Sequence, residues 1–280
     1  MLDLVLNPST KLQTDSFIVH PSHALLLYGQ SGSGKLSLAL KISESLIGAS
    51  DIENYPYLLH IAPKEGSISI EATREVQQFL KLKTPRNQTI NRVILIEDAG
   101  LLSREAQNSL LKHIEEPPVD TVFILTVNHI HDVLPTILSR VQKIAVGKAK
   151  KEDLMTLFSE QPVLDLEKSY AMSDGRPGLF IELVTNPDHT LHAAAKYARE
   201  IFAMSSYERL LEVDTLIKDP TYTHDVLFIM EQMAYLGLMN ANETSQRRWL
   251  HIVSLAYQAR EAIARNAQLK LALTNFMLQL

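Results

Sequence analysis

The sequence LLLYGQSGSGKLSLAL, residues 25–40, restricts the possible folds of this chain more than any other stretch. Residues 29–35 fit G-x-x-x-x-G-K, the loop in which backbone amides wrap phosphate groups and the lysine reaches the outer ones. The apolar run before the loop predicts a buried strand over residues 24–28, and the apolar spacing after it predicts a helix over residues 35–46. A strand, a glycine-rich loop and a helix in this order are typical of a parallel sheet covered by helices.

The residue after the loop lysine departs from the usual pattern. Leu36 stands where such loops carry a Ser or Thr hydroxyl that binds magnesium. Ser37 follows about 100° further round the helix, so its hydroxyl cannot simply substitute. The sequence therefore predicts a site for ATP or ADP in which Mg²⁺ binding stays open, the alternative being a glycine turn with a solvated lysine. The predicted nucleotide-binding residues are Gly29, Gln30, Ser31, Gly32, Ser33, Gly34, Lys35, Leu36 and Ser37.

A second candidate element is RVILIEDAG, residues 92–100, where an apolar strand over residues 92–96 runs into Glu97 and Asp98. The carboxyl ends of parallel strands line the edge at which such sheets bind ligands. One carboxylate at this edge would hold magnesium through water, and the other would polarise an attacking water. An acidic pair after a strand is also commonly a solvated turn, so the pair gains weight only together with the loop.

Short apolar strands alternate with helical patterns over the first half of the chain, which predicts an α/β fold with a parallel sheet. Ser103 is a suitable N-cap for a helix that Pro117 and Pro118 stop. From GKAKKEDL, which begins at Gly147, the pattern is all-helical. Besides the elements above, we expect strands over residues 57–61, 122–127 and 141–146, and helices over residues 71–82 and 104–116.

Composition limits the kinds of function. The chain has no cysteine, which excludes disulfides, cysteine nucleophiles and thiolate zinc sites. Its formal net charge of -5 gives no overall basic field for nucleic acid, so any DNA contact must be local or shared with partners. No targeting segment is evident, and no apolar stretch is long enough to span a bilayer. We therefore expect a cytoplasmic protein without a membrane partner.

Three stretches together resemble a known family. They are YPYLLHIAPKEGSISIEATREVQQFL, RVILIEDAGLLSREAQNSLLKHIEEPP and TVFILTVNHIHDVLPTILSRVQ, and the resemblance runs from His20 to Val146. They look like the AAA+ module of bacterial sliding-clamp loaders, and within that family most like the delta-prime subunits of DNA polymerase III. Two later stretches are similar more thinly: SDGRPGLFIEL to a lid helix, and NAQLKLALTNFMLQL to the last helix of the oligomerising collar.

The resemblance implies an organisation and partners. It implies an AAA+ P-loop nucleotide-binding domain over residues 1–147, a small helical lid domain over 148–187 and a helical collar for oligomerisation over 188–280. Motor and delta-like clamp-loader subunits are the implied partners. The sliding clamp and primed DNA are implied as partners through the complex.

The resemblance also assigns roles to single residues. Lys35 matches the loop lysine, Glu97 the magnesium-binding acid and Asp98 the catalytic acid. Asn128 matches the polar sensor that detects the terminal phosphate. Arg140 matches the arginine finger that such subunits offer to the ATP of a neighbour, and the alternative for it is a surface arginine after a helix turn.

Several departures separate this chain from the family's motor subunits. Motors carry aspartate and then glutamate after the strand, whereas this chain has the reverse order. Asp98 is one methylene shorter than the usual acid, and a displacement near 1 Å can cost about a hundredfold in rate. The position that matches the motors' lid arginine is Gly178, and Arg176 is not assigned that role. The four-cysteine zinc module is missing, IGASDIEN fills its place, and no zinc is expected.

The expected function is that of a delta-prime-like stator, which is a rigid subunit of the ring-shaped loader with weak or no intrinsic ATPase. Its Arg140 would complete a neighbour's ATP site while the loader places the clamp on DNA. A catalytically active AAA+ motor subunit is the main alternative, against which Leu36, Asp98 and Gly178 count. A stand-alone P-loop phosphotransferase is disfavoured by the clamp-loader segments. An interaction protein with an empty nucleotide site stays open.

Overall fold

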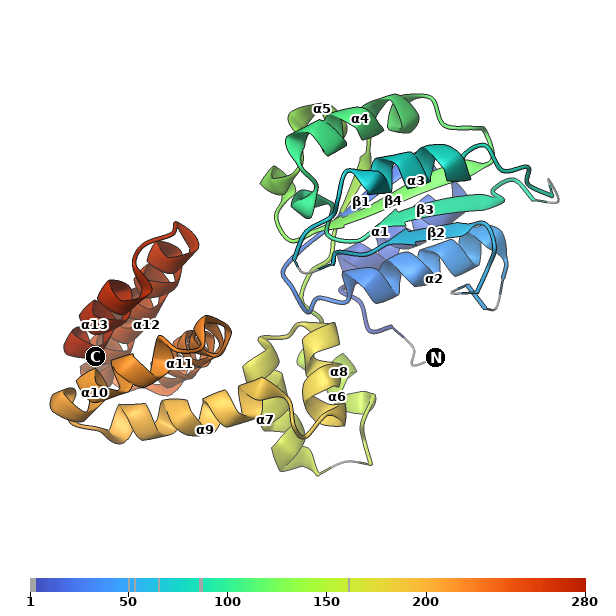
Figure 1. Ribbon diagram of the computed structural model, residues 1–280. Helices are drawn as coiled ribbons and strands as arrows, with labels where there is room; N and C mark the ends of the chain where they lie inside the picture. Colours follow the sequence, from blue (N-terminus) through green and yellow to red (C-terminus); the bar gives the residue numbers. More distant parts are fainter. Residues whose placement is uncertain (1–3, 50, 53, 65, 86–87, 161) are drawn as a thin grey trace. The chain divides into compact units, whose positions relative to one another are not determined.

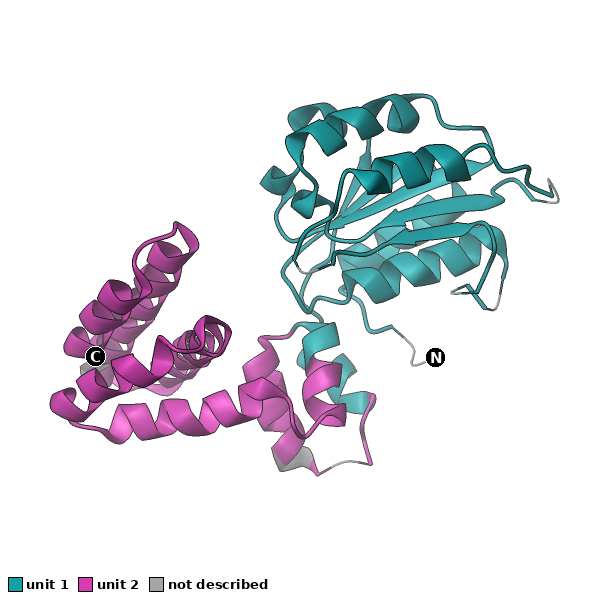
Figure 2. Ribbon diagram, viewed as in Figure 1, with its two compact units in different colours: residues 1–156, 176–179 teal, residues 157–175, 180–280 magenta. Residues whose placement is uncertain are grey.

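The computed structural model describes residues 4–49, 51–52, 54–64, 66–85, 88–160 and 162–280, so residues 50 and 53 of IGASDIEN lie outside it. The chain divides into two compact units (Figure 2). Unit 1 comprises Met1–Thr156 and Arg176–Leu179, and unit 2 comprises Leu157–Gly175 and Phe180–Leu280. The division into three domains, with boundaries after residues 147 and 187, stays a prediction.

Unit 1 contains a five-stranded sheet in the order β2-β3-β4-β1-β5, and all neighbouring strands are parallel. Each strand was expected, and the observed ends differ from the expected ones by at most one residue. Strands β3 and β4 are buried along their whole length, as is typical of a parallel sheet covered on both faces. The strands are β1 Ala24–Tyr28, β2 Leu58–Ile61, β3 Arg92–Ile96, β4 Thr121–Val127 and β5 Gln142–Ala145.

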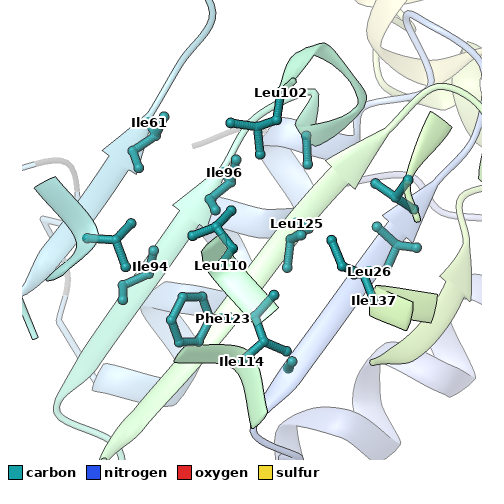
Figure 3. Packing of buried hydrophobic residues seen from close by; sticks show 14 of the residues in the cluster. Leu26, Ile61, Ile94, Ile96, Leu102, Leu110, Ile114, Phe123, Leu125 and Ile137 are labelled. Atoms are coloured by element: carbon teal, nitrogen blue, oxygen red, sulfur yellow. The ribbon is translucent and has the colours of Figure 1, made fainter. Parts of the chain in front are cut away.

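Helices cover both faces of this sheet (Figure 1). Successive residues of a strand point to opposite faces. Leu95 of β3 therefore packs with α1 (Pro8–Val19) and α2 (Lys35–Ile47), whereas Ile94 packs with α3 (Glu71–Phe79), α4 (Arg104–Glu115) and α5 (Pro135–Leu138). Figure 3 shows the second cluster, in which Leu110 and Ile114 of α4 lie close to Phe123 of β4.

The expected helices form with small differences at their ends. α4 begins after Ser103, whose hydroxyl accepts a hydrogen bond from the amide of Ala106 at 3.2 Å. α3 ends at Phe79 rather than at residue 82. The reason is Arg92, whose guanidinium donates to the carbonyl oxygens of Leu80 at 2.9 Å and Leu82 at 2.5 Å. These bonds satisfy carbonyls that a continuing helix would have used.

Helix α1 was not expected from the sequence. It begins after Asn7, whose side chain accepts from the amide of Ser9, and Pro8 occupies its first turn. Its buried face consists of Thr10, Thr14 and Phe17. Because two of these three inward positions are polar, the sequence lacks the apolar repeat from which an amphipathic helix is predicted.

The N-terminal helix also holds the chain where it leaves the sheet. The Asn7 amide donates to the carbonyl oxygen of Lys148 at 3.0 Å. The Thr10 hydroxyl donates to the carbonyl oxygen of Ala145 at 2.8 Å and accepts from the amide of Gly147 at 3.3 Å. Residues 145–148 are therefore fixed to α1 directly after β5.

The described part of the chain beyond β5 is helical, as expected. The single tryptophan, Trp249, lies in α12 and meets Phe202 of α9 with ring centroids 6.1 Å apart. No helix among the described residues is long and apolar enough to cross a membrane. The helices are α6 Lys151–Thr156, α7 Val163–Ser173, α8 Pro177–Thr185, α9 Thr190–Ala203, α10 Ser206–Leu216, α11 Pro220–Asn240, α12 Glu243–Ala264 and α13 Leu269–Gln279.

Candidate functional site

The glycine-rich loop lies at the carboxyl edge of the sheet, after β1 and beside the end of the central strand β4. The amide of Gly29 donates to the carbonyl oxygen of Val127 at 3.2 Å, so the loop leaves β1 beside the end of β4. Gly32 and Gly34 have φ angles of 78° and 83°, a left-handed conformation that glycine adopts without steric cost. Gly34 is the N-cap of α2, so the loop runs directly into the helix as expected.

Lys35 is engaged by its own loop and by β4. The side chain is buried, and its Nζ donates to the carbonyl oxygens of Gly29 at 2.7 Å and Gln30 at 3.0 Å, and to Oδ1 of Asn128 at 3.0 Å. An ammonium has three N–H donors, so these three contacts use all of them. Burial lowers the pKa of Lys35, and the nearby negative charge of Asp98 opposes that shift.

Asn128 connects the lysine to the acid at the end of β3. Its amide nitrogen donates to both carboxylate oxygens of Asp98, at 3.2 and 3.0 Å. Asp98 itself has a left-handed backbone with φ of 51°, and its amide donates to the Thr126 hydroxyl at 2.9 Å. Three of the predicted site residues, Lys35, Asn128 and Asp98, therefore form one hydrogen-bonded series across three elements.

Glu97 has a different partner. Its carboxylate lies 3.1 Å from Nε2 of His60 on the neighbouring strand β2. The sequence analysis assigned no role to His60. Its proximity to Glu97 follows from the pairing of β2 with β3, in which His60 lies opposite Leu95, two residues before Glu97.

Residues 176–179 lie directly on the glycine-rich loop. Arg176 donates from Nη1 to the carbonyl oxygen of Ser31 at 2.9 Å, and the amide of Leu179 donates to the carbonyl oxygen of Gly32 at 2.9 Å. The charge of Arg176 also lowers the pKa of Lys35. Gly178 is required here, because a Cβ at this position would lie 2.9 Å from the oxygen of Gly32 and 3.1 Å from the amide nitrogen of Gly34. No side chain fits where the motors carry their lid arginine.

The loop fits the phosphates of a nucleotide better than it fits magnesium. Its left-handed glycines and buried lysine are the residues that cradle phosphate oxygens. Leu36 offers no oxygen to a metal ion, and Glu97 is paired with His60. A phosphate at the lysine would have to displace the contacts to Gly29, Gln30 and Asn128.

Arg140, the predicted finger, lies after α5 at the surface. Its Nε is 2.5 Å from Oε1 of Glu115, and its Nη1 donates at 2.9 Å to both the carbonyl oxygen of Thr136 and the hydroxyl of Ser139. The side chain is 39% exposed. It is therefore ordered by its own α4 and α5 while it stays accessible from outside.

Comparison with known proteins places this fold and this loop in a family. The family model described as DNA polymerase III, delta subunit, matches residues 8–150, just over half of the chain. The chain belongs to the DNA polymerase III delta-subunit family. The expected delta-prime-like clamp-loader family is thereby confirmed.

Two relatives of this delta-family chain support the same family assignment. It is 30% identical over 178 residues to DNA polymerase III subunit delta' of Pseudomonas aeruginosa, covering 56% of this chain and 54% of that protein. It is 27% identical over 182 residues to the subunit delta' of Escherichia coli, covering 58% and 54%. The chain thus spans about half the length of the curated relatives it matches.

A solved structure supports the fold over nearly the whole delta-family chain. The DNA polymerase III gamma subunit-related protein of Thermotoga maritima has a TM-score of 0.58 at 18% identity and covers 96% of this chain and 97% of its own. This likeness concerns the fold alone. The expected class, an α/β unit with a parallel sheet followed by helices, is confirmed, whereas the roles of Glu97, Asp98, Asn128 and Arg140 stay predictions.

The close approach of Gly178 to the loop gives a first testable prediction for this delta-family chain. We expect Gly178→Ala to lower the free energy of unfolding of unit 1 by about 1–2 kcal/mol, because its Cβ meets backbone atoms of Gly32 and Gly34 that cannot yield easily. Denaturant unfolding followed by circular dichroism measures this. Gly147→Ala is the matched control, since a Cβ there comes no closer than 3.5 Å to any atom. Equal stability of the two variants would show that the 176–179 segment does not rest on the loop.

Proposed function

We propose that this chain is a delta-prime-like stator of the DNA polymerase III clamp loader. In this role Arg140 would complete the ATP site of a neighbouring motor subunit while the sliding clamp is loaded on primed DNA. The observation that carries the proposal is a contrast between two cations. Arg140 is accessible and held in a fixed geometry, whereas all three N–H groups of the Lys35 ammonium donate to oxygens of this same chain.

An arginine finger acts through charge and geometry. A planar guanidinium can bond two phosphate oxygens at once, and it stabilises the charge that develops during phosphoryl transfer. Arg140 lies after Leu138, the last residue of α5, which Ile137 anchors in the core. A short helix fixed to the sheet suits an arginine that must reach a ligand of another subunit, because a displacement of about 1 Å already costs rate.

The chain's own loop is arranged for holding rather than for turnover. Asn128 binds the Lys35 ammonium with its oxygen and the Asp98 carboxylate with its nitrogen. The Lys35 ammonium could bind a phosphate, and the Asp98 carboxylate could polarise a water, only after each had broken its hydrogen bond with Asn128. A bound ATP or ADP would be held by the backbone amides of residues 29–35 and by Lys35, and it would supply phosphate charge to the loop. Leu36 provides no ligand for magnesium, and no hydrolytic step is assigned to this site.

The proposal includes partners. Motor and delta-like subunits of the loader would surround this chain, and the clamp and primed DNA would be met through the complex. The formal charge of -5 supports this arrangement, because DNA affinity then depends on basic groups supplied by the assembly.

Reconstitution of the loader with and without this chain tests the proposal. We expect the DNA- and clamp-stimulated ATPase and clamp loading to require the chain, because one ATP site would lack its finger without it. The two rates are measured on complexes whose subunit content is fixed by mass. A loader that assembles and loads clamps equally well without the chain would contradict the function.

A further inference from the structure

The guanidinium of Arg140 is held on two sides. Glu115 contacts its Nε at 2.5 Å, and Thr136 and Ser139 accept from its Nη1 at 2.9 Å each. Among the described residues, no hydrogen bond to its third nitrogen, Nη2, is found. The guanidinium plane is thus fixed while the Nη2 edge stays available.

Glu115 itself is firmly supported. It is the last residue of α4, and its neighbour Ile114 is fully buried in the core cluster beneath the sheet face. The helix ends there, with Glu116 as its C-cap, because Pro117 and Pro118 cannot continue it. The carboxylate therefore projects from a rigid element rather than from a loop.

The pair with Arg140 contributes little to folding stability. Its side chains are 39% and 42% exposed, and ion pairs at such exposure are weak because water screens them. A carboxylate beside a finger also carries a charge of the same sign as phosphate, which by itself weakens phosphate binding. Its placement therefore makes sense as orientation of the guanidinium, since an ordered side chain loses less entropy on binding.

We propose that Glu115 is a positioning residue for the Arg140 finger, an inference that rests on the proposed function. Contact at Nε fixes the rotation of the guanidinium and directs the N–H groups of Nη2 toward the neighbour's terminal phosphate. Glu115 does not touch the phosphate, and it acts only through Arg140.

A double-mutant cycle in the reconstituted loader tests this. We expect Glu115→Ala to slow hydrolysis about tenfold at the one ATP site that the finger faces, at unchanged KM for ATP, since a disordered finger loses geometry in the transition state. Glu115→Gln should fall between native and alanine, because it keeps the size of the side chain and a polar oxygen beside Nε but loses the charge of the ion pair. In the Arg140→Ala background, Glu115→Ala should have no further effect.

Glu116→Ala is the matched control, because Glu116 follows on the same helix end and has no ion pair among the described residues. A native rate for Glu115→Ala, or a loss that persists in the Arg140→Ala background, would overturn the positioning role and leave the proposed function standing. If Arg140→Ala itself keeps the native rate, the finger and with it both proposals fail.

Discussion

Arg140→Ala is expected to lower ATP hydrolysis by about a thousandfold at the one site that the finger faces. Arginine fingers contribute about three to five orders of magnitude in related phosphoryl-transfer sites. In the proposed loader, neighbouring motor subunits would hold further ATP sites, so the total rate should fall only to what these sites sustain. Rapid-mixing measurement of phosphate release resolves the effect, because the burst should lose the amplitude of one ATP for each complex.

Arg140→Lys separates charge from geometry in this experiment. Lysine keeps the positive charge and loses the planar fork, so we expect it to recover little of the rate. Both variants should assemble normally, since the side chain is exposed and its contacts are local. An unchanged amplitude of the phosphate-release burst for Arg140→Ala in a fully assembled loader would mean that Arg140 is a surface arginine without a role in a neighbour's site. The stator hypothesis would then be wrong.

Lys35→Met is expected to lower the free energy of unfolding of unit 1 by about 2–4 kcal/mol. Methionine keeps an apolar stem of similar length and removes the ammonium. The oxygens of Gly29, Gln30 and Asn128 then lose their donor, and a buried acceptor without a partner costs about 1–3 kcal/mol. Relief from burying a charged lysine offsets part of this cost.

The two units can be followed separately in the same denaturant titration. Trp249, the single tryptophan, belongs to unit 2, so its fluorescence reports that unit and should not shift. Circular dichroism includes unit 1 and should show an earlier transition. Lys41→Met is the matched control on α2, because within the described part of the chain the Lys41 side chain makes a single ion pair, with Glu44 near the surface, whose loss should cost at most about 0.5 kcal/mol.

Lys35→Met also discriminates between stator and motor. In the assembled loader we expect its ATPase to stay near the native rate, because the proposed function requires no turnover at this loop. A stability equal to that of native protein together with a collapsed ATPase would mean that Lys35 serves a nucleotide. That outcome would favour a motor subunit.

The sheet and the loop were readable from the sequence because their signals are local. Strand burial, the glycine spacing and the Ser103 cap all lie within a few residues of what they determine. The approach of Asp98 to the loop of Lys35 was also predicted, since the carboxyl ends of parallel strands line one edge of the sheet, whereas Asn128 was assigned to the site by the family resemblance alone. Helix α1 was missed because Thr10 and Thr14 are inward-facing polar residues.

Contacts between distant parts of the chain carried no such signal. Arg176 reaches Ser31 across 145 positions, and the sequence showed only that it stands two residues before the expected lid position. Glu115 belongs to a stretch that resembles clamp-loader subunits, yet nothing in its spacing indicated a contact with Arg140. In both cases tertiary packing, which no period or spacing encodes, decided the partner.

The attachment of α1 to residues 145–148 has a mechanical consequence. β5 is an edge strand whose sheet neighbour is β1, and a strand pulled from one end detaches by breaking its ladder bonds in turn. Tension arriving along the chain that follows β5 meets the contact of Asn7 with Lys148 and that of Thr10 with Gly147 before it meets that ladder. Detachment of β5 from the sheet then requires these contacts with α1 and its N-cap to break first, so the N-terminal helix and the edge strand resist the same pull.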